Sequence, residues 1–220
     1  LKRGRTRFEL DLSNPFPGIT ERGISENFST QAPLSLYGAT KLASEILLLE
    51  YVHQFGLRAV INRCSILTGP WQMGKVDQGF VTYWVANHYF GKPLSYIGYG
   101  GTGKQVRDVL HIDDLVLLLK KQSEDIARFR GDIFQVGGGA ANSVSLCELT
   151  KLCRERTGRE VEVMPVQQTR PGDVIWYVTD NGNTQTTFGW TPERDATTIV
   201  ADTFRWMKEH EAAVTPFFNR

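Results

Sequence analysis

Tyr37 and Lys41 are the residues of this chain whose types and spacing suggest chemistry most directly. They stand four apart in a stretch that is typical of a helix start, and side chains at i and i+4 lie one above the other on a helix face. A phenol normally titrates near pH ~10, and a nearby ammonium favours its deprotonated form. Such a pair can take a proton from a substrate hydroxyl while hydride leaves the same carbon. For the bare pair, however, we favour the simpler interpretation of an exposed ring and a solvated lysine.

The helix that would carry this pair covers residues 35–55. Apolar side chains follow one another there and leave only narrow polar stripes, and Gly56 is a suitable helix stop. A helix that is apolar nearly all round is buried on two sides. We expect one side to pack on a sheet. The other side could pack on a second subunit or lie in the core of a monomer.

Residues 57–67 come next, and their apolar, β-branched composition predicts one buried parallel strand. A helix followed by such a strand is the repeat of a doubly wound α/β sheet. Ligands bind beyond the carboxyl ends of the strands in these sheets, which places residues 66–71 beside the site.

The remaining chain alternates between further helices and strands. We expect helices over residues 80–90, 115–121, 145–157 and 196–209, and strands over residues 94–97, 132–136 and 161–165. The glycines of residues 98–103 predict a hairpin turn, because they lack the spacing of a phosphate-binding P-loop. An aspartate that follows His111 is expected to cap the next helix. We therefore expect His111 to belong to a structured turn and not to act in catalysis. Residues 1–33 are rich in turn formers and predict a long loop.

Several segments together resemble a known family. Residues 35–45, which begin Ser-Leu-Tyr-Gly-Ala-Thr-Lys, are similar to the active-site helix of the extended short-chain dehydrogenase/reductases, the nucleotide-sugar epimerases and dehydratases. Segments similar to the family's other motifs follow in the same order, at residues 63–70, 107–114, 169–173 and 188–192. The resemblance implies that Tyr37 is the catalytic acid/base and that Lys41 also binds the nicotinamide ribose of NAD.

The resemblance also implies how a substrate is held. Arg107 and Arg170 would grip the diphosphate of a nucleotide-diphospho-sugar, and Gln78 would contact the sugar or the nucleotide. Arginine suits this task because its fork of donors matches phosphate oxygens and it keeps its charge. Alternatively, Arg107 forms a surface salt bridge with Asp108, and Arg170 lies in a turn without a ligand. Ile66 stands where the family usually has an asparagine, so one polar contact to the substrate is lost.

The implied activity is epimerisation by transient oxidation of a sugar carbinol. Tyr37, helped by Lys41, would deprotonate a sugar hydroxyl while NAD takes up hydride, and the hydride would then return. Residues 69–72, 77–79 and 103–108 are most similar to the branch of the CDP-paratose (tyvelose) 2-epimerases. Two alternatives stay open: a reductase or dehydratase of the same family, and a substrate-binding fragment without catalysis.

The domain organisation is expected to be that of a partial fold. The chain does not begin with Met, and no Gly-x-x-Gly-x-x-Gly turn precedes the tyrosine to bind the dinucleotide pyrophosphate. We expect the first half of the fold to be missing, together with the catalytic Ser or Thr, for which Ser13 and Ser35 are weak substitutes. The rest would be the C-terminal portion of a Rossmann-type doubly wound sheet with a smaller mixed domain. Residues 1–67 would be a remnant of the dinucleotide-binding domain and residues 68–220 mainly the substrate-binding domain, with residues 106–137 returning to the sheet.

The composition excludes several other classes of protein. The 25 Lys and Arg residues balance 24 Asp and Glu residues, so nothing favours nucleic acid or an acidic membrane surface as a partner. No uninterrupted apolar run approaches the ~20 residues that a membrane helix needs. Cys64, Cys147 and Cys153 are scattered and show no metal-ligand spacing. We therefore expect reduced thiols, no metal site and a cytoplasmic protein.

Overall fold

The computed structural model describes residues 1–31, 35–76 and 78–218 of the chain. Residues 32–34, around the end of the expected N-terminal loop, and Asp77 lie outside the described residues. The α-helices of the described part are α1 (Leu36–Phe55), α2 (Phe80–Phe90), α3 (Ile112–Glu124), α4 (Leu146–Thr157), α5 (Gly182–Phe188), α6 (Ala196–Glu209) and α7 (Glu211–Phe218). Two 3-10 helices are η1 (Ile126–Arg128) and η2 (Ala140–Asn142). The strands are β1 (Lys2–Arg3), β2 (Phe8–Glu9), β3 (Ile19–Thr20), β4 (Gly23–Ile24), β5 (Val60–Cys64), β6 (Ile66–Thr68), β7 (Leu94–Ile97), β8 (Val106–His111), β9 (Asp132–Val136), β10 (Ser143–Ser145), β11 (Val163–Val166) and β12 (Trp176–Tyr177).

Parallel strand pairs dominate the sheets. Strand β5 pairs with β9, β6 with β8, and β7 with β11, all in parallel, and the helices connect them. Parallel neighbours need such crossover connections, and helices usually supply them. The predicted α/β class is therefore confirmed as a mixed α/β fold with parallel sheets. The expected loop over residues 1–33 is mostly irregular but contains the four two-residue strands β1 to β4.

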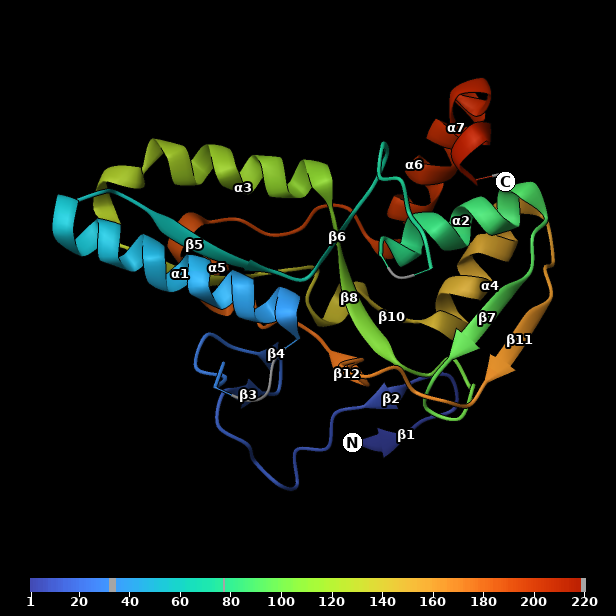
Figure 1. The fold of residues 1–220 in the computed structure, drawn as a ribbon, viewed down its shortest axis with the longest axis horizontal. Helices are drawn as coiled ribbons and strands as arrows, with labels where there is room; N and C mark the ends of the chain where they lie inside the picture. The colour runs from blue at the N-terminus through green and yellow to red at the C-terminus, as the bar shows by residue number, and fades with distance from the viewer. Residues whose placement is uncertain (32–34, 77, 219–220) are drawn as a thin grey trace.

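Strand β8 joins the two halves of the molecule (Figure 1). Its first residues pair with β10 and β12, whereas its last three residues pair with β6. The single strand predicted over residues 57–67 was wrong, because the chain changes its strand partner at Ser65. The Ser65 N–H donates to the Val136 carbonyl (2.8 Å), and its hydroxyl donates to the Asp108 carbonyl (3.0 Å). One residue thus separates β5, which pairs with β9, from β6, which pairs with β8.

Two hydrophobic clusters fill the two halves. In one half α2, α4 and α6 pack on each other around buried residues such as Trp84, Leu149 and Met207. In the other half Leu118 of α3 and Phe134 of β9 lie in a core with the end of α5. Figure 1 shows the first group at the right and the second at the left, where β5 runs between α1 and α3 in this view. The strand β8 contributes residues to both clusters, so it sets the position of one half against the other.

Helix α1 begins after Ser35 and ends at Phe55, with Gly56 as its C-cap, within one residue of the prediction. Ser35 is its N-cap, since its hydroxyl oxygen accepts a hydrogen bond from the Gly38 N–H (3.0 Å). The expectation of burial on two sides was wrong for this chain, because Val52 is the one buried residue among the described residues of α1. Leu47 and Phe55 are 61% and 71% exposed. The structure therefore rules out a position of α1 inside the core of this chain as it stands.

Two smaller predictions also need correction. The glycines of residues 98–103 do not form a hairpin turn, because the strands on either side pair elsewhere, β7 with β11 and β8 with β6, β10 and β12. Helix α3 begins at Ile112, earlier than expected, and His111 itself caps it by accepting the Asp113 N–H at Nδ1 (3.1 Å). The helices over residues 80–90 and 196–209 are confirmed, as is the N-cap Ser145 of α4.

Helix α7 was not predicted. No helix in the described part of the chain is long and apolar enough to cross a membrane.

Candidate active site

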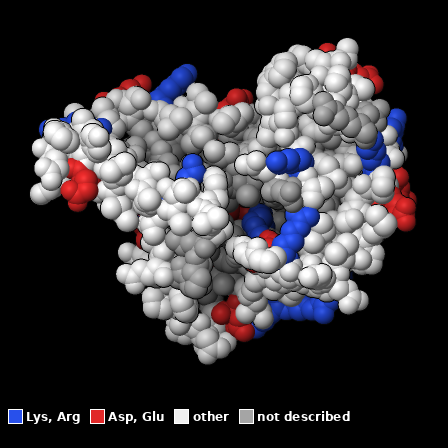
Figure 2. Space-filling view, viewed as in Figure 1, with Lys and Arg blue, Asp and Glu red and all other residues white. Residues whose placement is uncertain are grey.

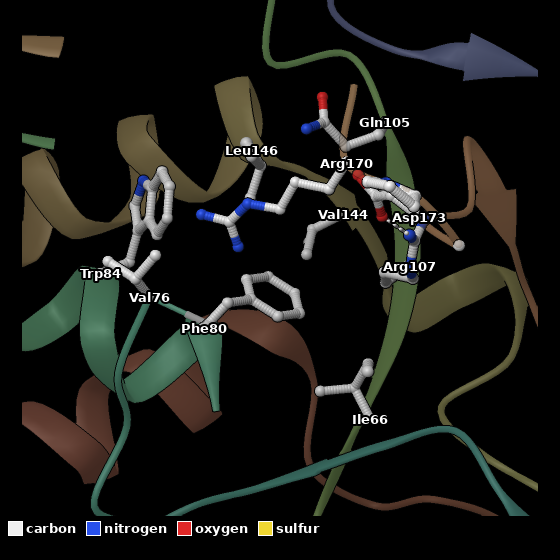
Figure 3. A pocket seen from close by; sticks show the side chains of 12 residues that line it. Ile66, Val76, Phe80, Trp84, Gln105, Arg107, Val144, Leu146, Arg170 and Asp173 are labelled. Atoms are coloured by element: carbon white, nitrogen blue, oxygen red, sulfur yellow. Dashed lines mark hydrogen bonds and ion pairs between the residues drawn. The ribbon is translucent and has the colours of Figure 1, made fainter. Parts of the chain in front are cut away.

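Arg107 and Arg170, 63 residues apart in the sequence, line the same cavity. The cavity has a volume of about 430 Å³, within the size range of small-molecule sites. Figure 3 shows the two arginines with Gln105 and Asp173 on one side of the cavity, and Phe80 and Trp84 of α2 on another. The sequence alone placed these arginines in separate motifs, and the fold brings them together.

Arg107 is held by strand β8 and by an ion pair. Its Nη2 lies 3.0 Å from Asp173 Oδ1, and its Nη1 donates to the Val106 carbonyl (2.8 Å). The arginine side chain is 17% exposed, and burial lowers the pKa of Arg107, an effect that the Asp173 carboxylate partly offsets. A guanidinium in such a place has a strong electrostatic reason to bind an anion. The alternative of an Arg107–Asp108 salt bridge at the surface was wrong, since the partner is Asp173.

Asp108, the residue after Arg107, has a structural role. It is fully buried, its Oδ1 accepts a hydrogen bond from the Ser65 hydroxyl, and its Oδ2 accepts the Gly139 N–H (2.9 Å). Burial raises the pKa of Asp108, whereas these hydrogen bonds oppose the shift. The carboxylate ties β8 to the β5–β6 junction and to the glycine turn after β9, and so fixes the strand that presents Arg107.

The other walls of the cavity are largely apolar. Ile66, Phe80, Val144 and Leu146 contribute to them, and Trp84 is fixed there because its indole N–H donates to Thr150 (2.9 Å). A ligand that fits must combine an anionic group for the arginines with a less polar or aromatic part. Ile66, which stands where the family usually has an asparagine, also lines this cavity. Figure 2 shows basic side chains gathered around a hollow on this face of the molecule.

Tyr37 and Lys41 line a second cavity, of about 510 Å³, between α1 and β5. The Lys41 ammonium lies over the Tyr37 ring, 5.3 Å from its centroid, so both groups share one face of the helix. The Tyr37 side chain is 68% exposed and is therefore accessible to a ligand. Helix α1 presents both groups to the cavity because its N-cap, Ser35, starts the helix just before them.

A hydrogen-bonded ion pair joins α1 to β5 at this cavity. Arg63 donates to both carboxylate oxygens of Glu45, at 3.0 Å through Nε and at 2.7 Å through Nη2. This hydrogen bonding to Glu45 raises the pKa of Arg63. Such a two-point contact fixes orientation as well as distance. The sequence did not predict this pair, although Glu45 lies four residues after Lys41 in the matching motif.

The two cavities are neighbours along the chain. Cys64 lines the cavity of Tyr37 and Lys41, and Ile66 lines the cavity of the two arginines, with Ser65 between them. The change of strand partner at Ser65 therefore places the candidate acid/base and the candidate anion site on either side of one junction.

Gln78 is not among the residues that line either cavity. It is exposed, and its backbone pairs with that of Lys75 in the loop before α2. Val76 of the same loop does line the arginine cavity. The structure thus brings the loop, but not the Gln78 side chain, to the site. Within the described ranges, no group of three or more His, Cys, Asp or Glu residues could hold a metal ion.

The fold and these motifs define a class of protein. The model of the NAD dependent epimerase/dehydratase family matches residues 13–137, more than half of the chain, and the chain belongs to this family. It is 31% identical to CDP-paratose 2-epimerase of Salmonella typhi over 179 residues, which cover 78% of this chain and 51% of that protein. It is 28% identical to dTDP-glucose 4,6-dehydratase of Streptomyces antibioticus over 206 residues, which cover 92% of this chain and 58% of that protein.

A solved structure supports the same fold. UDP-glucuronic acid 4-epimerase from Bacillus cereus, in complex with UDP-glucuronic acid and NAD, superposes with a TM-score of 0.75. The match covers 87% of this chain and 58% of that structure at 23% identity, a level that shows the fold alone. The chain spans about half the length of the curated relatives described above.

Proposed function

We propose that this chain carries the catalytic helix and the substrate pocket of an NAD-dependent epimerase of a nucleotide-diphospho-sugar, similar to CDP-paratose 2-epimerase. The observation that carries this proposal is the meeting of Arg107 and Arg170 in one cavity. Two guanidinium groups in one partly desolvated cavity suit two linked phosphates, because each charge then meets an opposite one. The cavity of Tyr37 and Lys41 lies across Ser65 from it, where a sugar attached to the diphosphate would extend.

The proposed domain organisation follows from the same family membership. Residues 1–67 would belong to the dinucleotide-binding domain and residues 68–220 mainly to the substrate-binding domain, with residues 106–137 returning to the first sheet. The pairing of β5 with β9 supports this return, since β9 lies within the last of these ranges. The chain would then represent the C-terminal portion of a Rossmann-type fold.

The residues at the second cavity fit the ribose and nicotinamide of NAD. Tyr37 offers a hydroxyl and Lys41 an ammonium on one accessible face, and both can bind a ribose diol. When bound, NAD supplies a hydride acceptor that later returns the hydride. Tyr37 takes the proton of the sugar hydroxyl at its phenolic oxygen and gives it back after inversion. The Lys41 charge stabilises the deprotonated phenol before it takes up this proton and again after it returns it.

The arginines position the sugar without taking part in the proton transfer. Arg107 and Arg170 hold the diphosphate at a fixed distance from the catalytic helix, which reduces the freedom of the sugar that must react. The Glu45–Arg63 ion pair fixes α1 against β5 at the cavity of Tyr37 and Lys41. A reductase or dehydratase would use the same residues, and the dehydratase relative keeps that alternative open.

Binding of CDP and NAD, each added alone, tests the proposal. Increases in the melting temperature with both ligands are the expected result, because each cavity then has its own ligand. A response to CDP alone would favour the alternative of a substrate-binding fragment. No response to CDP would contradict the assignment of the arginine cavity. Arg128→Ala should respond to each ligand as the wild-type chain does, since Arg128 is exposed and pairs with Asp125 away from both cavities.

We further propose a homodimer through α1. The helix exposes Leu36, Ile46, Leu47, Tyr51 and Phe55, and one described residue of the helix, Val52, is buried. An exposed apolar surface of this kind marks an interaction site. Leu47→Glu should convert a dimer into a monomer in light scattering, whereas Leu119→Glu on α3, at a leucine that is 43% exposed, should not. A wild-type chain that is monomeric at high concentration would contradict this proposal.

The three cysteines are free, which fits the reducing cytoplasm that we propose as the location of the protein.

A further inference from the structure

The glycine-rich segment over residues 98–103 lies against the part of the chain that leads to Arg170. The Gly98 N–H donates to the carbonyl of Val166 at the end of β11 (2.8 Å). A Cβ on Gly101 would lie only 2.8 Å from the nearest atom of β11, so glycine is needed for this close approach. The segment therefore supports the loop that follows β11 and carries Arg170.

Tyr99, within this segment, is hydrogen-bonded to both ends of the loop. Its backbone N–H donates to the Thr169 hydroxyl (3.0 Å), and its phenolic O–H donates to the Asp173 carbonyl (2.8 Å). These two partners stand one residue before and three residues after Arg170, so the two bonds bracket the arginine. The Tyr99 ring also packs edge-on against Phe8 of β2, with the ring centroids 6.4 Å apart. This contact orients the phenol toward the loop.

The backbone of Tyr99 has an unfavourable conformation. Its φ of 50° lies in the left-handed region, which is costly for a residue with a Cβ. Among the described residues, Trp71 is the one other non-glycine residue with a positive φ. Such a conformation persists where the surrounding contacts hold it, and it is common at functional sites. At Tyr99 those contacts are the two hydrogen bonds to the loop of Arg170.

Asp173 connects this bracket to the second arginine of the cavity. Its backbone N–H donates to the Arg170 carbonyl (3.2 Å), and its carboxylate pairs with Arg107 (3.0 Å). Figure 3 shows Asp173 beside Arg107 at the cavity. Arg107 is fixed by β8, whereas Arg170 depends on the loop for its position. The hydrogen bond from Tyr99 to Asp173 therefore acts on the spacing between the two arginines.

We propose that Tyr99 is a positioning residue, which sets the distance between the guanidinium groups of Arg107 and Arg170 and so matches the cavity to two linked phosphates. The inference rests on the proposed function, which places a diphosphate in this cavity. A diphosphate must meet both arginines at once, so its affinity depends on their spacing. A single phosphate can bind to one arginine and tolerates a change in spacing. Tyr99 thus favours nucleoside diphosphates over monophosphates.

Calorimetric titration of the 220-residue chain with CDP and CMP, which differ by one phosphate, tests this assignment. The weaker CMP affinity is measured by displacement against CDP. Tyr99→Phe removes the phenolic donor and keeps the ring, and Thr169→Val removes the acceptor of the other bond and keeps the shape. Tyr51→Phe is the matched control, because Tyr51 packs against Phe55 on α1, outside the residues that line the arginine cavity.

We expect the wild-type chain to bind CDP more tightly than CMP. In Tyr99→Phe and in Thr169→Val the CDP affinity should fall roughly three- to tenfold, the effect of one hydrogen bond, while the CMP affinity stays within about twofold. Tyr51→Phe should leave both affinities unchanged. The selectivity for CDP over CMP is the decisive readout, because a general disturbance of the fold would weaken both ligands alike.

Unchanged CDP affinity in both variants, or equal losses for CDP and CMP, would overturn the inference and leave the proposed function intact. A wild-type chain that binds CMP as tightly as CDP would also overturn it. If the wild-type chain did not bind CDP, the proposed function itself would fail. Circular dichroism checks the fold, and should Tyr99→Phe not fold, Thr169→Val decides. If neither variant folded, the bracket would serve the fold alone, which also contradicts the inference.

Discussion

Arg107 and Asp173 form an ion pair of 3.0 Å inside the cavity where we place a diphosphate. The two side chains come from β8 and from the loop after Arg170, and they are only 17% and 28% exposed. Asp173 therefore neutralises Arg107 when no ligand is present. A bound diphosphate must compete with this carboxylate or displace it. The pair thus keeps a buried cation stable in the free protein, but lowers its affinity for anions.

The first prediction concerns Asp173→Asn, which removes the charge and keeps the shape. Pyrophosphate affinity should rise by roughly three- to tenfold, because the competing carboxylate is lost. The free energy of unfolding should fall by about 1–2 kcal/mol, because a mostly buried guanidinium loses its charged partner. Calorimetry and urea unfolding measure the two effects. A variant that binds pyrophosphate more weakly than wild type would show that Asp173 helps to hold the ligand.

The second prediction concerns the two arginines. Arg107→Ala and Arg170→Ala should each weaken CDP binding on the order of 10- to 100-fold, the effect of losing charge-assisted hydrogen bonds to phosphate. Because both residues would hold one diphosphate, the double variant should lose less than the sum of the single effects predicts. Arg205→Ala, at an exposed arginine of α6 that pairs with Asp202, is the control. Unchanged CDP affinity in both single variants would remove the diphosphate from this cavity.

The third prediction concerns Tyr37→Phe. We expect Tyr37→Phe to abolish turnover of a CDP-sugar, because no group remains to take the proton of the substrate hydroxyl. CDP affinity should stay within about twofold of wild type, since the arginine cavity is separate. Tyr51→Phe is a matched control on the same helix, where Tyr51 packs against Phe55. Retained turnover in Tyr37→Phe would exclude Tyr37 as the acid/base.

The fourth prediction concerns stability at mildly acidic pH. His88 is fully buried, its Nδ1–H donates to the Trp84 carbonyl (2.8 Å), and desolvation lowers its pKa below 6.5. The unfolded chain therefore takes up a proton near pH 6.5 that the folded chain still excludes. This contribution to stability is complete above pH 6.5 and is lost as the pH falls toward the folded-state pKa. Desolvation likewise lowers the pKa of His111, which adds to the loss.

Urea unfolding at about pH 7.5 and about pH 5.5 measures this effect. The wild-type chain should be less stable at the lower pH, and His88→Gln should reduce that difference. Replacement of the exposed His53 by Gln is the control and should leave the difference unchanged. A wild-type chain that is equally stable at both pH values would show that the two buried histidines exert no net effect on stability.

The sequence predicted local elements well where short-range physics decides them. Helix α2 was expected over residues 80–90, and the structure gives the same bounds with Gly91 as C-cap. Strand β9 over residues 132–136 and the N-cap Ser145 also agree. Hydrophobic periodicity, capping side chains and glycine turns act over a few residues, so the chain carries these signals without reference to its fold.

The sequence also determined the family and the candidate chemistry, since Tyr37, Lys41, Arg107 and Arg170 all lie in motifs that keep their order along the chain. Only the tertiary structure decided which of these residues share a cavity. The break at Ser65 and the choice of Asp173 as the partner of Arg107 depend on contacts between distant segments. Such contacts depend on where strands pair and how helices pack, and no local pattern encodes them.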